Sequence, residues 1–109
     1  MTVASLKELF EERIPHKLQA HPDVAAKIGA IYQLDVAGPE GGSWFVDLAT
    51  PGGRVAQGTA PEAQCTIAMK DSDLLAMVNG KLSPSMAFMT GKIKIKGDYA
   101  LAMKLQQVL

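Results

Sequence analysis

The sequence predicts an α+β domain, in which a five-stranded, mostly antiparallel sheet is covered on one face by helices. Two observations lead to this prediction. Apolar residues follow a helical spacing at the start of the chain, alternate strictly from about residue 30, and return to helical spacing after residue 70. In addition, 109 residues with 48% hydrophobic and 20% charged side chains suffice for one hydrophobic core. We therefore expect a single domain over residues 1–109.

A helix is expected near the start of the chain. Ser5 and Glu8 have the spacing of a capping box. Apolar residues follow at helical intervals: Val3, Leu6, Leu9, Phe10 and Ile14. Pro15 should end or kink this helix, because proline lacks the backbone N–H that the next turn needs. A second short helix is predicted from Asp23 to Ile28.

Four short strands are predicted in the middle of the chain. Apolar and polar side chains alternate over residues 30–36, 44–48, 54–58 and 65–69, which is the pattern of strands with one buried face. Glycine and proline residues separate the first three, as in tight turns. We expect three or four of these strands to form an antiparallel meander.

The last third of the sequence predicts two helices, a fifth strand and a final helix. The fifth strand is the strict alternation of lysine and isoleucine over residues 92–96. The helices are bounded by residues with capping or terminating preferences: Asp71 or Ser72 and Gly80, then Ser83-Pro84 and Gly91, and finally Asp98, which precedes a helix from Tyr99 to Leu109.

Charge is balanced overall but unevenly distributed. Residues 1–79 carry six basic and ten acidic side chains, a net charge of −4, whereas residues 80–109 carry five lysines and one aspartate, a net charge of +4. A neutral chain with no arginine in its basic part is not expected to bind nucleic acid. A single cysteine, no signal-peptide pattern and no long apolar run predict a cytoplasmic protein without disulfides.

No catalytic motif is evident. His16 and His21 lack the spacing of a helical metal pair, and there is no nucleophile elbow, dinucleotide fingerprint or phosphate loop. Cys65 is expected on a buried strand face, where a thiol is inert. We therefore expect no enzyme activity, no metal and no cofactor. A cofactor-free enzyme stays a weaker alternative, with Tyr32, Tyr99 and Cys65 as the titratable groups at inward positions.

Methionine is concentrated in the helices of the second half. Met77, Met86, Met89 and Met103 all fall there. Flexible, polarizable methionine suits a surface that accepts apolar partners of different shapes, but it also fills ordinary cores. Composition alone leaves both interpretations open.

From about Ile28 to its end, the chain resembles the sterol carrier protein-2 domain, also known as the nonspecific lipid-transfer domain. The order and spacing of several short pieces carry the resemblance: Trp44-Phe-Val-Asp-Leu48, Cys65-Thr-Ile67, Asp71-Ser-Asp73, Gly80-Lys-Leu-Ser-Pro84, Ala87-Phe88, Gly91-Lys-Ile-Lys94, Gly97 and Ala102-Met-Lys-Leu-Gln106. The resemblance implies an apolar tunnel between sheet and helices that holds a fatty acid, fatty acyl-CoA, phospholipid or sterol.

The resemblance also implies which residues contact the lipid. The expected lipid-binding residues lie on the sheet wall, the two middle helices and the last helix: Trp44, Val46, Ile67, Met77, Val78, Met86, Phe88, Met89, Leu101, Leu105 and Gln106. Trp44 fits a plain core role equally well, and Gln106 fits a solvent-facing position as well as contact with a ligand head group. Members of the family often continue further, so we expect a more open cavity mouth, or one closed by a second subunit.

Four lysines have two interpretations: Lys81, Lys92, Lys94 and Lys96. Lysines on an outward face protect an edge strand from pairing with other chains. They also suit anionic head groups, transient membrane contact or the phosphates of acyl-CoA. The chain is expected to be a monomer or weak homodimer. The alternative to a lipid carrier is an interaction or dimerisation module of the same fold without ligand.

Overall fold

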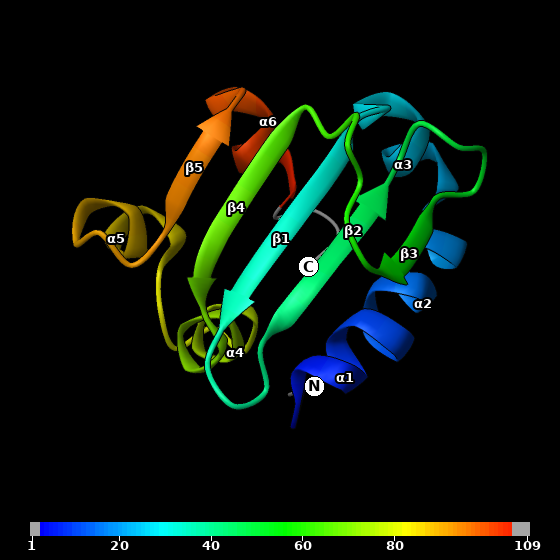
Figure 1. Cartoon of the computed structure of the whole chain (residues 1–109). Helices are drawn as coiled ribbons and strands as arrows, with labels where there is room; N and C mark the ends of the chain where they lie inside the picture. Colours follow the sequence, from blue (N-terminus) through cyan, green and yellow to red (C-terminus); the bar gives the residue numbers. More distant parts are fainter. Residues whose placement is uncertain (1–2, 106–109) are drawn as a thin grey trace.

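A five-stranded mixed sheet forms one layer of the molecule, and helices cover one of its faces (Figure 1). The computed structural model describes residues 3–105. The strands are β1 (Ile31–Ala37), β2 (Gly42–Asp47), β3 (Arg54–Gln57), β4 (Cys65–Lys70) and β5 (Lys94–Gly97), in the sheet order β3-β2-β1-β4-β5. This architecture confirms the α+β class and the mostly antiparallel sheet.

The fourth strand does not continue the predicted meander. β1, β2 and β3 pair antiparallel in sequence order, but β4 lies on the other side of β1 and pairs with it in parallel. The connecting loop is held by Gln33, whose side-chain NH₂ donates to the Gly58 carbonyl (3.1 Å) and whose side-chain oxygen accepts from the Ala60 N–H (2.8 Å). Beside central β1, β4 buries Cys65, Ile67 and Met69. If β4 instead paired with the short edge strand β3, the apolar face of β4 would be less well buried.

The N-terminal helices are α1 (Leu6–Glu8), a π-helical turn η1 (Leu9–Arg13), α2 (Ile14–Ala20) and α3 (Pro22–Ile28). Half of the predicted capping box is present: Ser5 Oγ accepts from the Glu8 N–H at 3.2 Å, whereas the Glu8 carboxylate accepts from the N–H of Ala4, the residue before the N-cap, at 3.0 Å. Pro15 does not end the helix, which runs on to Ala20. The wider π turn directly before Pro15 rearranges the hydrogen bonds where the proline supplies no N–H.

The second half contributes α4 (Asp71–Val78), α5 (Pro84–Met89) and α6 (Tyr99–Lys104). Ser83 and Asp98 cap α5 and α6 as predicted, each accepting from backbone N–H groups of the first turn. Asp71 does not act as the N-cap residue of α4, because it begins the helix and its Oδ2 accepts from the Glu40 N–H at 3.0 Å. The predicted end of the last helix lies outside the described residues. Within residues 3–105, no helix is long and apolar enough to cross a membrane.

The core is one cluster of buried residues, and two parts of it lie under different helices. Under the N-terminal helices, Phe10 stacks on Trp44 with ring centroids 4.7 Å apart and planes at 6°. Leu9 and Ile14 are fully buried in the same region. The other part lies between β1, β4 and β5 on one side and α4, α5 and α6 on the other, and it contains the cavity described next.

Candidate functional site

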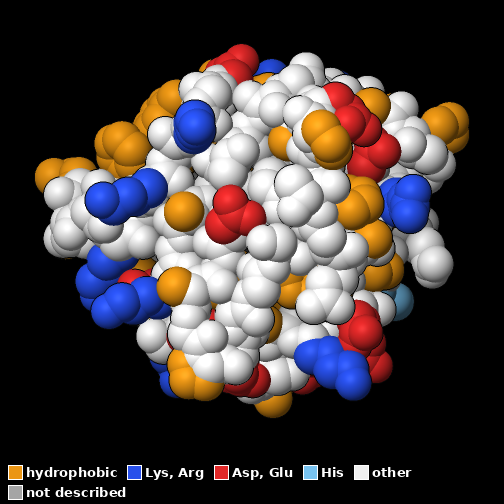
Figure 2. Space-filling view, in the orientation of Figure 1, with side chains coloured by type: hydrophobic (Ala, Val, Ile, Leu, Met, Phe, Trp, Pro, Cys, Tyr) orange, Lys and Arg blue, Asp and Glu red, His pale blue; other side chains and the backbone are white. Residues whose placement is uncertain are grey.

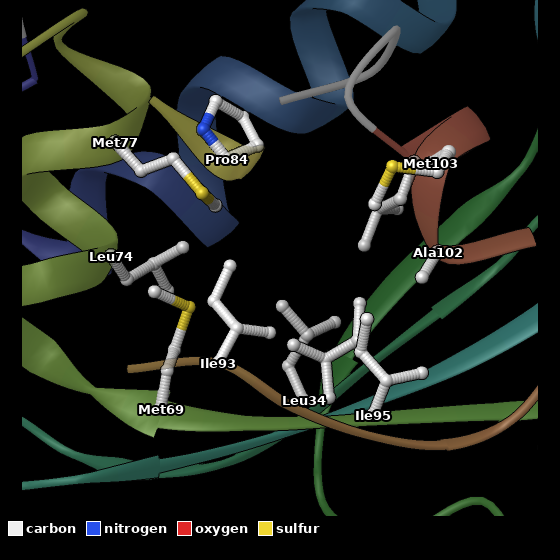
Figure 3. A pocket seen from close by; sticks show the side chains of 11 residues that line it. Leu34, Met69, Leu74, Met77, Pro84, Ile93, Ile95, Ala102 and Met103 are labelled. Atoms are coloured by element: carbon white, nitrogen blue, oxygen red, sulfur yellow. The ribbon is translucent and has the colours of Figure 1, made fainter. Parts of the chain in front are cut away.

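A small cavity lies between the sheet and the three helices of the second half (Figure 3). It measures about 30 Å³ and therefore has room for about one water-sized group. Its lining is wholly apolar and comes from the sheet, the three helices and the segment before β5: Leu34, Ile67, Met69, Leu74, Met77, Pro84, Ile93, Ile95, Ala102, Met103 and Leu105.

Three aligned strands form the floor of this cavity. Leu34 of β1 is paired with Ile67 of β4, which is paired with Ile95 of β5. Because alternate side chains of a strand point to the same face, these three side chains all point toward the helices. Met69 and Ile93 extend the floor at one end.

The helices form the walls. Met77 of α4 and Met103 of α6 approach the cavity from opposite sides, and Pro84 lies above it at the start of α5 (Figure 3). Ala102 is buried on α6 and is the smallest side chain of the lining. Methionine side chains change shape easily, so the walls can adapt to an apolar guest.

Titratable groups lie beside the cavity but not in its lining. The Tyr32 hydroxyl donates to the Leu101 carbonyl of α6 at 2.6 Å. Burial raises the pKa of Tyr32 to about 12, and the charges of Cys65 and Asp98 act in the same direction. Burial, followed by the Asp98 charge, also raises the pKa of the Cys65 thiol. Both groups stay protonated at neutral pH, which does not suit a nucleophile or a general base.

No cluster of three or more histidine, cysteine, aspartate or glutamate side chains suitable for a metal ion is found within residues 3–105. The arrangement beside the cavity therefore offers burial of an apolar group, and the lining offers no polar partner for a head group.

The expected lipid-binding residues that the structure describes are divided among three environments. Ile67, Met77 and Leu105 line the cavity. Trp44, Val46, Val78 and Leu101 belong to the core or pack against it without lining the cavity. Met86, Phe88 and Met89 are exposed on α5. Gln106 lies outside the described residues.

Eight lining residues were not among the predicted site residues: Leu34, Met69, Leu74, Pro84, Ile93, Ile95, Ala102 and Met103. A signal for some of them was present in the sequence. Ile93 and Ile95 alternate with the lysines of the fifth strand, so one side of that strand had to be apolar and inward. Pro84 gave no such signal, because its position follows from how α5 meets the sheet.

The predicted lysines lie at one edge of the molecule. Lys94 and Lys96 are exposed on edge strand β5, on the face opposite the inward Ile95. Lys92 and Lys94, with Lys70, line an open groove of about 510 Å³ on this side. The Lys92 Nζ lies 3.9 Å from an Asp73 carboxylate oxygen. Lys81 is exposed in the turn between α4 and α5. Their contact with an anionic ligand stays a prediction.

Residues 6–109 match the family model described as the SCP-2 sterol transfer family. The chain belongs to this family. It is 44% identical over 88 residues to human hydroxysteroid dehydrogenase-like protein 2, a match covering 80% of this chain and 21% of that protein. It is 46% identical over 85 residues to bovine sterol carrier protein 2, covering 75% of this chain and 16% of that protein. The chain thus spans about a fifth of the length of these relatives.

Solved structures of the family have the same fold. The solution structure of palmitated SCP2L2 from Aedes aegypti matches with a TM-score of 0.75 at 32% identity, covering 99% of this chain and 94% of the other. The resemblance to the sterol carrier protein-2 domain is therefore confirmed, and so is the lipid-binding fold that it implied.

Proposed function

We propose that the chain is a non-catalytic lipid carrier, which binds the long acyl chain of a fatty acid between β1, β4, β5 and helices α4, α5 and α6. The observation that carries this proposal is the cavity, whose lining residues are all apolar and whose floor is formed by three paired strands. The palmitated relative, at 32% identity, supports a saturated acyl chain as the ligand class.

Binding requires the cavity to expand. Its volume of about 30 Å³ is far below the roughly 300–1,000 Å³ of typical ligand sites. Strand pairing fixes the sheet that forms the floor. The wall residues Pro84, Ala102 and Met103 lie on α5 and α6, which are six-residue helices and can move more easily. We infer that the acyl chain enters by lifting these helices and turning the methionines, and gains about 0.8 kcal/mol for each methylene that leaves water.

The apolar lining favours selection by chain length and shape over selection by head group. A carboxylate would therefore remain near the cavity mouth, in water or beside the lysines. Acyl-CoA, phospholipid and sterol are further candidate ligands of the same site. A single buried thiol fits the reducing conditions of the cytoplasm, where we expect the protein to act.

A second candidate is an interaction or dimerisation module without ligand. The exposed apolar side chains of α5 favour it, because such residues often mark a contact with another protein. In this case the cavity would be only a packing defect of the core. Lipid binding by the isolated chain separates the two candidates.

The test is a titration of delipidated protein with a fluorescent long-chain fatty acid, followed by competition with palmitate, palmitoyl-CoA and a sterol. Saturable one-to-one binding that palmitate displaces is the expected result, and the competitor order ranks the ligand classes. Circular dichroism of the delipidated protein serves as the control for folding. A folded protein that binds none of these lipids would refute the carrier and favour the interaction module.

A further inference from the structure

An open groove lies at one edge of the sheet, on the face that the helices leave uncovered. It has a volume of about 510 Å³ and is formed by the ends of β1 and β4, the first turn of α4 and the residues that lead into β5. Figure 2 shows basic side chains gathered on the left of the molecule, where β5 begins (Figure 1). The groove is lined by Asp35, Ala37, Ala68, Met69, Lys70, Ser72, Asp73, Gly91, Lys92 and Lys94.

The groove adjoins one end of the apolar cavity. Met69 lines both of them. In Figure 3, Met69 and Leu74 lie at the end of the cavity opposite Ala102 and Met103 of α6. In three places a groove residue is the neighbour in sequence of a cavity residue: at Met69 and Lys70 of β4, at Asp73 and Leu74 of α4, and along Lys92 to Ile95 before and within β5.

Strand pairing does not close the wall between groove and cavity at this end. The pairing of β4 with β5 ends at Ala68 and Lys94. Beyond this point, the ion pair of Lys92 and Asp73, with Nζ and Oδ1 3.9 Å apart, joins the segment before β5 to α4. The two side chains are 48% and 19% exposed, and partly exposed ion pairs of this kind contribute little to stability. Apolar side chains of the lining and a weak ion pair thus close this end.

We propose that this end is the mouth of the cavity and that the carboxylate of a bound fatty acid lies in the groove. The acyl chain then passes between β4, the start of α4 and the segment before β5 into the cavity. This basic mouth comprises Lys70, Lys92 and Lys94, with Asp73 as the residue that the ligand carboxylate replaces. The proposal rests on the proposed function and adds the place where the head group binds.

A ligand carboxylate is suited to take the place of Asp73 beside Lys92. Both groups are carboxylates, and the present N···O distance of 3.9 Å is longer than the roughly 2.7–2.9 Å of a charged hydrogen bond. Separating the pair frees Lys92 for the head group and opens the way to the cavity. Because the groove is open, the carboxylate keeps contact with water, so the large cost of burying an unpaired charge does not arise.

The charge of the groove suits a single carboxylate. Its lining has three lysines and two aspartates, a net charge of +1. Asp35 Oδ1 already accepts hydrogen bonds from the Gln33 side-chain NH₂ and the Ser43 hydroxyl, both at 3.2 Å. Lys70 and Lys94 make no ion pair among residues 3–105. These two lysines are therefore available to an anionic head group.

The α6 end of the cavity is less suited to a carboxylate. The hydroxyl of Tyr32 lies beside it but already donates to the Leu101 carbonyl at 2.6 Å. Lys104 is exposed on α6 next to the lining residues Met103 and Leu105, and it is the alternative cation for a head group there. Lifting α5 and α6 makes the room that the acyl chain needs, whereas the basic mouth sets the end at which the chain enters.

The experiment compares palmitate with hexadecanol, the uncharged alcohol with a chain of the same length, as competitors of an uncharged fluorescent acyl ester on delipidated full-length protein. The wild type should bind palmitate about tenfold more tightly than hexadecanol. Lys92→Gln/Lys94→Gln should weaken palmitate about tenfold, at about threefold per lysine, and leave hexadecanol unchanged. Asp73→Asn releases Lys92 from its ion pair and should strengthen palmitate about threefold.

Two control variants remove one lysine each outside the groove. Lys96→Gln lies on the same strand and face as Lys94, and Lys104→Gln tests the α6 end; both should leave the preference for palmitate unchanged. Equal wild-type affinity for palmitate and hexadecanol would refute the basic mouth, as would a preference that Lys92→Gln/Lys94→Gln retains or that Lys104→Gln abolishes. A folded protein that binds neither compound would refute the proposed function itself, so the two failures are distinguishable.

Discussion

Filling the cavity from α6 should block lipid binding more than it destabilises the fold. Ala102 is 5% exposed and lines the cavity, which has room for about one methylene-sized group. Ala102→Leu adds a larger side chain, of which only part fits. Overpacking of this kind costs about 1–3 kcal/mol, so we expect the melting temperature to fall by roughly 4–12 °C.

The effect on lipid follows from the space that the leucine takes. If the added carbon atoms displace about three ligand methylenes into water, binding loses about 2.4 kcal/mol at about 0.8 kcal/mol each. The dissociation constant for palmitate should then rise about 60-fold. The assay is competition against the fluorescent fatty acid, with isothermal calorimetry to confirm the stoichiometry.

The matched control makes the same substitution two residues earlier on the same helix. Ala100 is exposed, so Ala100→Leu should change stability by less than about 0.5 kcal/mol and leave palmitate binding unchanged. Equal palmitate affinity of a folded Ala102→Leu protein and the wild type would refute the reasoning, because the acyl chain would then occupy another site.

Further predictions concern Tyr32 and Cys65, which lie beside the cavity, and Gly97 at the end of β5. Tyr32→Phe removes the hydrogen bond to α6, so we expect a loss of about 0.5–1.5 kcal/mol in urea unfolding and faster fatty-acid release in stopped-flow measurements. In the folded protein the pKa of Tyr32 is raised from 10.0 to about 12. The protonated hydroxyl therefore stabilises the fold fully below pH 10, and this contribution is lost as the pH rises toward 12. Over this interval the free energy of unfolding should fall more for the wild type than for Tyr32→Phe. Cys65 should resist a thiol reagent in the folded protein and react on unfolding, because burial raises its pKa; reaction at the same rate in both states would contradict this. Gly97→Ala should lower the free energy of unfolding by about 1–3 kcal/mol, because φ is +100° and the new Cβ would overlap the Gln64 carbonyl oxygen. Gly91→Ala meets only the unfavourable φ of +76°, so it should lower the free energy of unfolding less in the same assay.

The local elements could be predicted because their signals lie within a few residues. The alternation of Lys92 to Lys96 predicted β5, and Asp98 predicted the start of α6. The place of β4 in the sheet could not be predicted in this way. Its alternation shows that Cys65, Ile67 and Met69 share a buried face, but it does not show which strand lies beside them. That choice depends on the burial of the whole sheet and on the loop that Gln33 holds.

The candidate site was harder to predict than the fold, and α5 shows why. Met86, Ala87, Phe88 and Met89 are all apolar, so their periodicity does not identify the inward face of so short a helix. The structure buries Ala87 and exposes the three larger side chains. The family resemblance implied that the large residues contact lipid inside, whereas the close approach of α5 to the sheet favours the small residue there.

The short helices α5 and α6 and the small volume of the cavity have a common consequence for lipid affinity. Helices of six residues are not stable alone, so α5 and α6 are held by contacts with the sheet across the cavity lining. An acyl chain that enters must replace these contacts, and part of its binding free energy is spent on separating helix from sheet. Affinity is then lower than the buried methylenes alone would give, and release is correspondingly fast.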